Sequence, residues 1–221
     1  MISHPAIAAV ERPARVLVIG GGDGGTVREV LRHAPVEQVV MVEIDQEVID
    51  VSQRFLPAIG TAFDNPRLEL RIGDGVAYAA EAPDESFDVV LLDGSDPVGP
   101  AEGLFGERFY RDVARILRPG GIFGLQSESP ILMPDLFCQI QRALAGIFSD
   151  VRPYLGPVPL YGASSWSWTL ARREGDVLPL DLSIIEALEP SLRYLNRDIC
   201  RGAFALPNYI RDLLRSSGTS D

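Results

Sequence analysis

The chain has 221 residues, of which 46% are hydrophobic, and its formal net charge is -11. This apolar content predicts one domain with a substantial core and a C-terminal extension. The negative charge argues against a nucleic-acid partner, because it would repel phosphates. No apolar stretch is long enough to predict a membrane span and no secretory leader is visible, so we expect a cytoplasmic protein without a membrane partner. The two cysteines, Cys138 and Cys200, lack metal-ligand spacing, which predicts reduced core thiols and no metal site.

Predicted strands and helices alternate from residue 15 to about residue 150. Apolar, β-branched runs predict strands at 16–19, 39–44, 68–72, 87–92 and 121–126. Amphipathic segments predict helices at 26–33, 46–55, 108–117 and 136–148, and a β-rich return is expected at 161–171. In the second of these helices, Val48, Val51 and Phe55 form one apolar stripe. The alternation is typical of an α/β protein with a Rossmann-like, doubly wound, mostly parallel sheet, in which ligands bind at the carboxyl ends of the strands.

The first strand runs directly into a glycine-rich turn, Gly20-Gly21-Gly22-Asp23-Gly24-Gly25, which opens the first predicted helix. Glycines allow the backbone to turn tightly and to approach a ligand closely. Asp23 is the unusual member, because phosphate-binding turns leave this position at a helix start free for an anion. A carboxylate there repels a pyrophosphate and attracts a cation. The turn therefore predicts a positively charged, nucleoside-like ligand and argues against a dinucleotide.

Acidic residues follow four of the predicted strands and fall on the ligand-binding edge of the sheet: Asp23, Glu43, Asp74 and Asp93. Glu43 comes 23 residues after Gly20, the spacing of the acid that binds ribose hydroxyls in nucleoside-binding folds. Asp74, between two glycines, can accept a hydrogen bond from an adenine amine. A single acid could instead be a helix cap. Four like charges in one cleft repel one another unless a cation binds, which leaves Asp23 and Asp93 to hold that cation.

The segment that begins at Asp93 is rich in proline and glycine, and residues 93–105 read Asp-Gly-Ser-Asp-Pro-Val-Gly-Pro-Ala-Glu-Gly-Leu-Phe. Such a composition predicts an ordered, lid-like loop beside the ligand. For this segment taken alone, the alternative is an ordinary surface loop that Asp93 caps.

Together these residues resemble the spermidine synthase family, the polyamine aminopropyltransferases. The blocks that carry the resemblance are residues 20–25, 42–45, 73–75 and 93–105, with further matches at 125–130, at Tyr161 and Trp166, and at 201–207. They span essentially the whole chain, and few other families follow such a glycine-rich turn with both Glu43 and an Asp-x-Ser-Asp-Pro segment. The resemblance implies the sheet of class I methyltransferases, with residues 15–221 as a single catalytic domain and residues 1–14 as an N-terminal remnant.

The resemblance implies decarboxylated S-adenosylmethionine as co-substrate, methylthioadenosine as product and a diamine such as putrescine as acceptor, with no permanently bound cofactor. This donor has lost its carboxylate and keeps an ammonium and a sulfonium, so an acidic pocket suits it. The family pattern places donor-binding roles on Gly20, Gly22, Asp23, Gly24, Glu43, Asp74, Gly75 and Pro100. It makes Asp93 the catalytic base, and it assigns the acceptor to Asp96, Tyr161 and Gln126.

The chain departs from the family pattern at its beginning. A typical member begins with a small β-rich domain, whereas this chain starts at the methionine of the family's Tyr-His-Glu-Met segment. The upstream tyrosine and histidine that contact the acceptor, and a glutamine of the missing domain, are therefore expected to be absent. We expect a complete donor site, half of the acceptor channel and a homodimer formed through the α/β core.

Two other functions stay open on the sequence. A methyltransferase on the same fold would use intact S-adenosylmethionine, although Asp23 and Asp93 would repel its carboxylate. A weakly active nucleoside-binding or regulatory homologue would fit a chain that lacks half of the acceptor channel.

Overall fold

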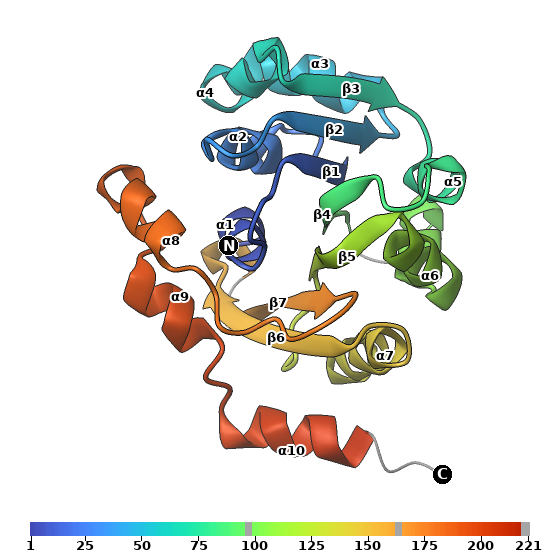
Figure 1. Cartoon of the computed structure of the whole chain (residues 1–221), viewed down its shortest axis with the longest axis vertical. Helices are drawn as coiled ribbons and strands as arrows, with labels where there is room; N and C mark the ends of the chain where they lie inside the picture. Colours follow the sequence, from blue (N-terminus) through green and yellow to red (C-terminus); the bar gives the residue numbers. More distant parts are fainter. Residues whose placement is uncertain (96–98, 162–164, 218–221) are drawn as a thin grey trace.

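The structure of the protein is a computed structural model that describes residues 1–95, 99–161 and 165–217. Its centre is a seven-stranded sheet with the strand order β3-β2-β1-β4-β5-β7-β6 (Figure 1). The strands are β1 (Arg15–Gly20), β2 (Gln38–Glu43), β3 (Leu68–Ile72), β4 (Phe87–Asp93), β5 (Leu117–Gln126), β6 (Asp150–Pro157) and β7 (Ser165–Arg172). Strands β1 to β5 are parallel, whereas β7 is antiparallel to both of its neighbours. This arrangement confirms the predicted doubly wound, mostly parallel α/β fold.

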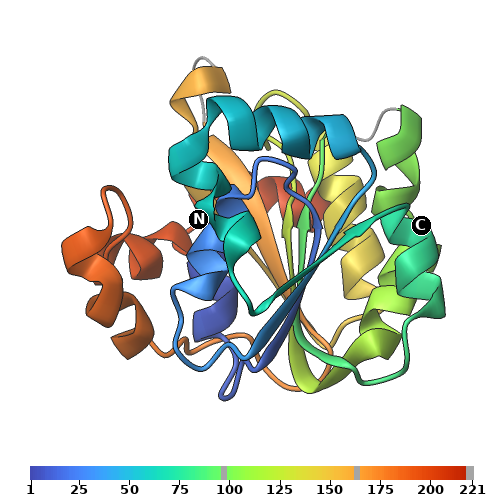
Figure 2. The same cartoon turned by 90° about the horizontal axis from the view of Figure 1, so that it is seen from above.

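Helices cover both faces of the sheet (Figure 2). One face carries α1 (Ser3–Ala8) and α2 (Gly25–Leu31), and the other carries α5 (Gly75–Glu81), α6 (Glu107–Ile116) and α7 (Pro134–Ala145). The remaining α-helices are α3 (Gln46–Phe55), α4 (Pro57–Gly60), α8 (Ser183–Leu188), α9 (Arg197–Ala203) and α10 (Asn208–Ser217). Short 3₁₀ helices are η1 (Thr61–Asp64), η2 (Gly99–Phe105), η3 (Pro159–Tyr161) and η4 (Glu189–Ser191).

The apolar run of β1 supplies both halves of the core, because successive residues of a strand point to opposite faces of the sheet. Val16 and Val18 belong to the cluster under α1 and α2, whereas Leu17 and Ile19 belong to the cluster under α5, α6 and α7. All four side chains are buried. A continuous apolar run predicts this for a strand that is covered on both faces, and burial of each side chain stabilises the fold by roughly 1.5–3 kcal/mol.

Strand β5 begins four residues earlier than predicted and is irregular. We expected a helix up to this point and a strand only after the Pro-Gly-Gly segment, but Leu117 already pairs with Phe87 of β4. The register then shifts before regular parallel pairing resumes. Gly120 has a φ of 73°, a left-handed conformation that favours glycine. The Pro-Gly-Gly segment therefore forms an irregularity inside the strand and not a boundary before it.

Helix α3 has the predicted boundaries, but its apolar stripe is exposed. Val48, Val51 and Phe55 are 42%, 54% and 63% exposed, whereas Ile49 is buried. Val48 packs against the glycine-rich turn, since a Cβ on Gly22 would lie 2.6 Å from Val48 Cγ1. The stripe therefore exists on the helix but faces away from the core, toward the strand ends and solvent.

Strand β6 and the last three α-helices were not predicted. The expected β-rich return at 161–171 corresponds to β7, which lies between β5 and β6 in the sheet. Helices α8 and α9 pack beside α1 around Cys200, and α10 packs against α7 beside Cys138 (Figure 1). Both cysteines are buried free thiols, as predicted. Within the described ranges, no helix is both long and apolar enough to cross a membrane.

A buried polar cluster ties α1 to α2. His4 Nδ1 lies 2.9 Å from His33 Nε2, and His4 Nε2 lies 3.2 Å from the carboxylate of Glu29. Glu29 also accepts hydrogen bonds from Arg28 and Arg32. The hydrogen bond from His4 and the two arginines lower the pKa of Glu29 to about 2, against the effect of burial. Burial, together with the charges of His4 and Arg32, lowers the pKa of His33 to about 4, so His33 is neutral at neutral pH.

Mild acid should destabilise the fold through His33. Its folded-state pKa of about 4 lies below the ordinary 6.5, so the unfolded chain binds more protons between these values. The contribution of His33 to the free energy of unfolding is therefore fully present above pH 6.5. It falls as the pH drops through this window, by about 1–2 kcal/mol between pH 7 and pH 5. Urea unfolding at both pH values measures this loss, and His33→Asn should remove most of it. A variant that is as sensitive to acid as the wild type would contradict the assignment.

Candidate functional site

A cavity of about 480 Å³ opens at the edge where the parallel strands end. It is lined by residues 19–23, 42–44, Val48, Asp74, Gly75, 93–95, Ala101 and Leu104. Strand register brings these segments together, because parallel pairing sets Gly20 of β1 beside Asp93 of β4 and Ile19 beside Val42 of β2. The four strand-end acids therefore lie in one cavity, as predicted.

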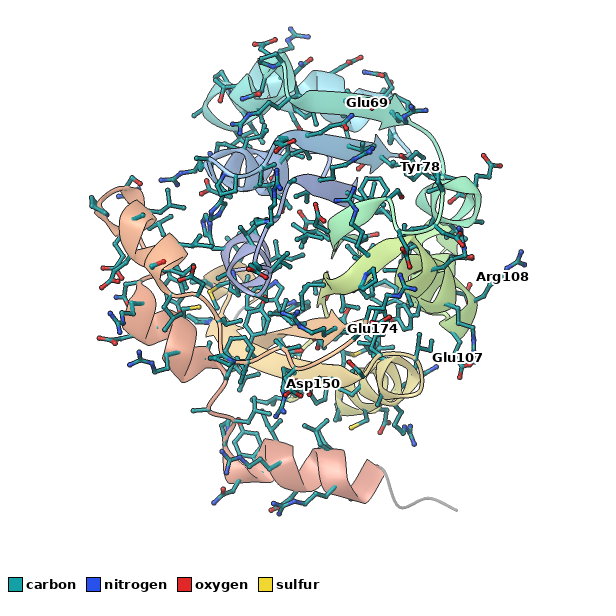
Figure 3. All side chains as sticks on the ribbon, in the orientation of Figure 1. Glu69, Tyr78, Glu107, Arg108, Asp150 and Glu174 are labelled. Carbon is teal, nitrogen blue, oxygen red and sulfur yellow. The ribbon has the colours of Figure 1, made fainter. Side chains whose placement is uncertain are left out.

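Within the described part of the chain, none of Asp23, Glu43, Asp74 and Asp93 forms an ion pair. By contrast, Glu107 at the start of α6 lies on the outer surface and pairs with an arginine one turn further on (Figure 3). Carboxylates that share a cavity repel one another, so this site favours a ligand that carries positive charge.

The glycine-rich turn rests on the end of β4. Gly20 has a φ of 78°, and a Cβ on it would lie 2.4 Å from the carbonyl oxygen of Asp93. The Gly21 amide donates a 2.9 Å hydrogen bond to the same oxygen. On the other side of the turn, a Cβ on Gly22 would lie 3.0 Å from the carboxylate of Glu43. Glycines therefore let the turn approach two of the acids closely and leave room for a ligand between them.

Asp93 lies at the end of β4, beneath the turn. Its Oδ2 accepts a 2.6 Å hydrogen bond from Thr26 Oγ1 in the first turn of α2. Burial raises the pKa of Asp93 above its ordinary value, the hydrogen bond from Thr26 opposes this, and the negative charge of Asp23 adds to it. A carboxylate with a raised pKa in a cavity is suited to take a proton from a substrate. Nothing in the sequence singled out Thr26.

The other three acids each accept one backbone hydrogen bond. The donor in every case is the amide two residues further along the chain, at 2.7 Å for Asp23 and Asp74 and at 3.1 Å for Glu43. The helix-cap alternative is therefore correct for Asp74, which caps α5. Capping does not compete with ligand binding here, because each carboxylate has a second oxygen. Glu43 is only 8% exposed, so its side chain is largely shielded from solvent.

Other predicted site residues lie apart from this cavity or beyond what the structure describes. Gln126 is buried at the end of β5, where a neighbouring carboxylate accepts a hydrogen bond from its amide, and it does not line the cavity. Gly24 lies at the start of α2, just outside the lining. Pro100 and Tyr161 lie in η2 and η3, of which only the backbone is described at these positions, and Asp96 lies outside the described residues. The donor half of the predicted site is thus assembled in one place, and the acceptor roles stay predictions.

Apolar residues form walls of the cavity that the sequence analysis missed. Ile44 directly follows Glu43, and Val48 lies in the first turns of α3. Ala101 and Leu104 belong to η2, within the segment expected to form an ordered loop beside the ligand. Ile44 is 56% exposed, so its side chain offers open apolar surface. The sequence signal that could have predicted this wall is an apolar pair four residues apart, Ile44 and Val48, directly after Glu43.

Comparison with known proteins agrees with this geometry. The family described as "Spermine/spermidine synthase domain" matches residues 1–179. A polyamine aminopropyltransferase of Desulforudis audaxviator (strain MP104C) is 41% identical over 215 residues, which are 97% of this chain and 77% of that protein. A polyamine aminopropyltransferase of Prochlorococcus marinus (strain MIT 9313) is 48% identical over 173 residues, 78% of this chain and 60% of the relative.

Solved structures agree as well. A spermidine synthase in complex with the transition-state analogue AdoDATO superposes with a TM-score of 0.93 at 33% identity, over 98% of this chain and 74% of the other. The spermidine synthase from Thermotoga maritima gives a TM-score of 0.88 at 33% identity, over 97% and 72%. The chain belongs to the spermine/spermidine synthase family.

Proposed function

We propose that the protein transfers an aminopropyl group from decarboxylated S-adenosylmethionine to a diamine such as putrescine, giving spermidine and methylthioadenosine. The observation that carries this proposal is the set of four carboxylates that line one cavity at the strand ends and form no ion pair among the described residues. Its supports are the family match and the names of the relatives. Under this proposal the enzyme is a cytoplasmic homodimer and uses the donor as a co-substrate, without a permanently bound cofactor.

The lining suggests how the donor binds. Glu43, beside the glycine-rich turn, accepts hydrogen bonds from the ribose hydroxyls. Asp74 accepts one from the adenine amine, while Ile44 and Leu104 provide apolar surface for the ring. The cationic part of the donor, its sulfonium and ammonium, then extends toward Asp23 and Asp93. Each positive charge of the donor then lies near an acid that forms no ion pair with the described residues.

The reaction is a direct displacement at carbon. An amine of the acceptor attacks the methylene next to sulfur, the new C–N bond forms as the C–S bond breaks, and the electron pair of that bond stays on sulfur as methylthioadenosine leaves. An alkyl amine has a pKa of about 10 and is mostly protonated at neutral pH. Asp93 takes this proton, since it lines the cavity and burial raises its pKa.

The residues proposed to bind the acceptor are assigned from the resemblance of the sequence to the family. Asp96 binds the second ammonium of the diamine, and Tyr161 and Gln126 line its channel. Much of the rate then comes from holding two cations, which otherwise repel each other, in a reactive orientation.

The relative affinities of three related ligands test whether the carboxylates of the cavity select against a negatively charged ligand. We expect methylthioadenosine and the decarboxylated donor to bind about a hundredfold more tightly than intact S-adenosylmethionine, because the carboxylate of the intact molecule would meet Asp23 and Asp93. Calorimetric titration with the three ligands measures the difference. Equal affinities would favour a methyltransferase that uses the intact molecule.

The ribose assignment predicts that Glu43→Gln weakens binding of methylthioadenosine by about 1.5–3 kcal/mol, the range for hydrogen bonds to a charged group. The glutamine can still accept the backbone hydrogen bond of the loop, so the unfolding temperature should change little. Glu47→Gln, an exposed change in the first turn of α3, is the matched control. Unchanged affinity in Glu43→Gln would show that the ribose lies elsewhere.

Substitutions of Asp93 and Asp96 should change different kinetic parameters. Asp93→Asn keeps the shape and removes the base, so kcat should fall about a hundred- to ten-thousandfold while methylthioadenosine still binds. Asp96→Asn should mainly raise the KM for the acceptor, because it removes attraction for an ammonium in the ground state. Steady-state kinetics with putrescine, cadaverine and spermidine separates the two effects. The mechanism is wrong if Asp93→Asn keeps most of the wild-type activity.

A further inference from the structure

One side-chain hydrogen bond joins the first turn of α2 to the proposed base. Thr26 Oγ1 donates to Asp93 Oδ2 at 2.6 Å, and Thr26 is only 7% exposed. The two residues are 67 positions apart in the chain. A threonine in a helix commonly bonds back to its own backbone. Here the hydroxyl instead crosses to the end of β4, although Thr26 itself does not line the cavity.

This bond makes the two oxygens of Asp93 unequal. Oδ2 is engaged by Thr26, whereas Oδ1 has no hydrogen-bond partner among the described residues. We propose that Thr26 is a positioning residue for aminopropyl transfer: its hydroxyl fixes Asp93 through Oδ2 and thereby leaves Oδ1 as the atom that takes the proton of the acceptor amine. The inference rests on the proposed function of Asp93 as the base.

The charges around Asp93 explain why the hydrogen bond from Thr26 matters. Burial and the nearby carboxylate of Asp23 both raise the pKa of Asp93, while the hydrogen bond from Thr26 and the amino group of Met1 lower it. A hydrogen bond donated to the ionised carboxylate stabilises the ionised form relative to the protonated form. Asp93 can accept a proton only when it is ionised, so the bond from Thr26 both orients the base and favours its ionised form.

A set of substitutions at Thr26 tests this role. Thr26→Val keeps the branched shape of the side chain and removes the hydroxyl that donates the hydrogen bond. The kcat should therefore fall about tenfold, with little change in the KM for decarboxylated S-adenosylmethionine. The acid limb of the pH profile of kcat/KM should move to higher pH by about one unit, because the carboxylate loses a bond that lowers its pKa. Thr26→Ser retains the hydroxyl and should restore both values. Thr26→Ala removes the donor with a smaller side chain, in case valine disturbs folding.

Thr61→Val, which removes an exposed hydroxyl in η1, is the control and should match the wild type. A wild-type pH profile and kcat in both Thr26→Val and Thr26→Ala, alongside an inactive Asp93→Asn, would overturn the role of Thr26 alone. An active Asp93→Asn would instead overturn the proposed base. A loss of activity that Thr26→Ser does not rescue, with the acid limb unmoved, would show that Thr26 is merely structural.

Discussion

Backbone pairing between β1 and β4 sets Gly20 beside Asp93, and the amide of Gly21 binds the carbonyl oxygen of the same aspartate. A side chain at Gly20 would collide with that oxygen, so this contact requires glycine. From it follow the path of the glycine-rich turn, the start of α2 and the position of Thr26 against Asp93. The turn is thus held by the strand that carries the proposed base, and a shift of either would move both.

Electrostatic repulsion is the cost of this arrangement. Four carboxylates line one cavity of a chain whose net charge is -11, and the hydrogen bonds they accept from the described residues come from backbone amides and from one threonine hydroxyl. A ligand with a sulfonium and an ammonium relieves this repulsion, whereas a ligand that carries a carboxylate adds to it. The same charges therefore explain both the affinity and the selectivity that we propose.

The helices around the sheet are also tied to one another. The core on one face of the sheet is closed by α1, which the cluster of His4, His33 and Glu29 ties to α2. Helices α8 and α9 pack outside α1, at the left of the view in Figure 2. Since α2 carries Thr26 in its first turn and Glu29 in its next, the polar cluster and the proposed base are linked through one short helix.

The sequence by itself determined the parallel sheet and the four strand-end acids, because apolar runs with a strand period and glycines at their ends are local features. The spacing of 23 residues between Gly20 and Glu43 is also a local feature, because it follows from the βαβ unit. Only the tertiary structure decided that the α3 stripe is exposed, that β5 already pairs with β4 at Leu117, and that Thr26 binds Asp93. These outcomes depend on which elements become neighbours. Contacts between residues far apart in the chain leave no local periodicity that a sequence can display.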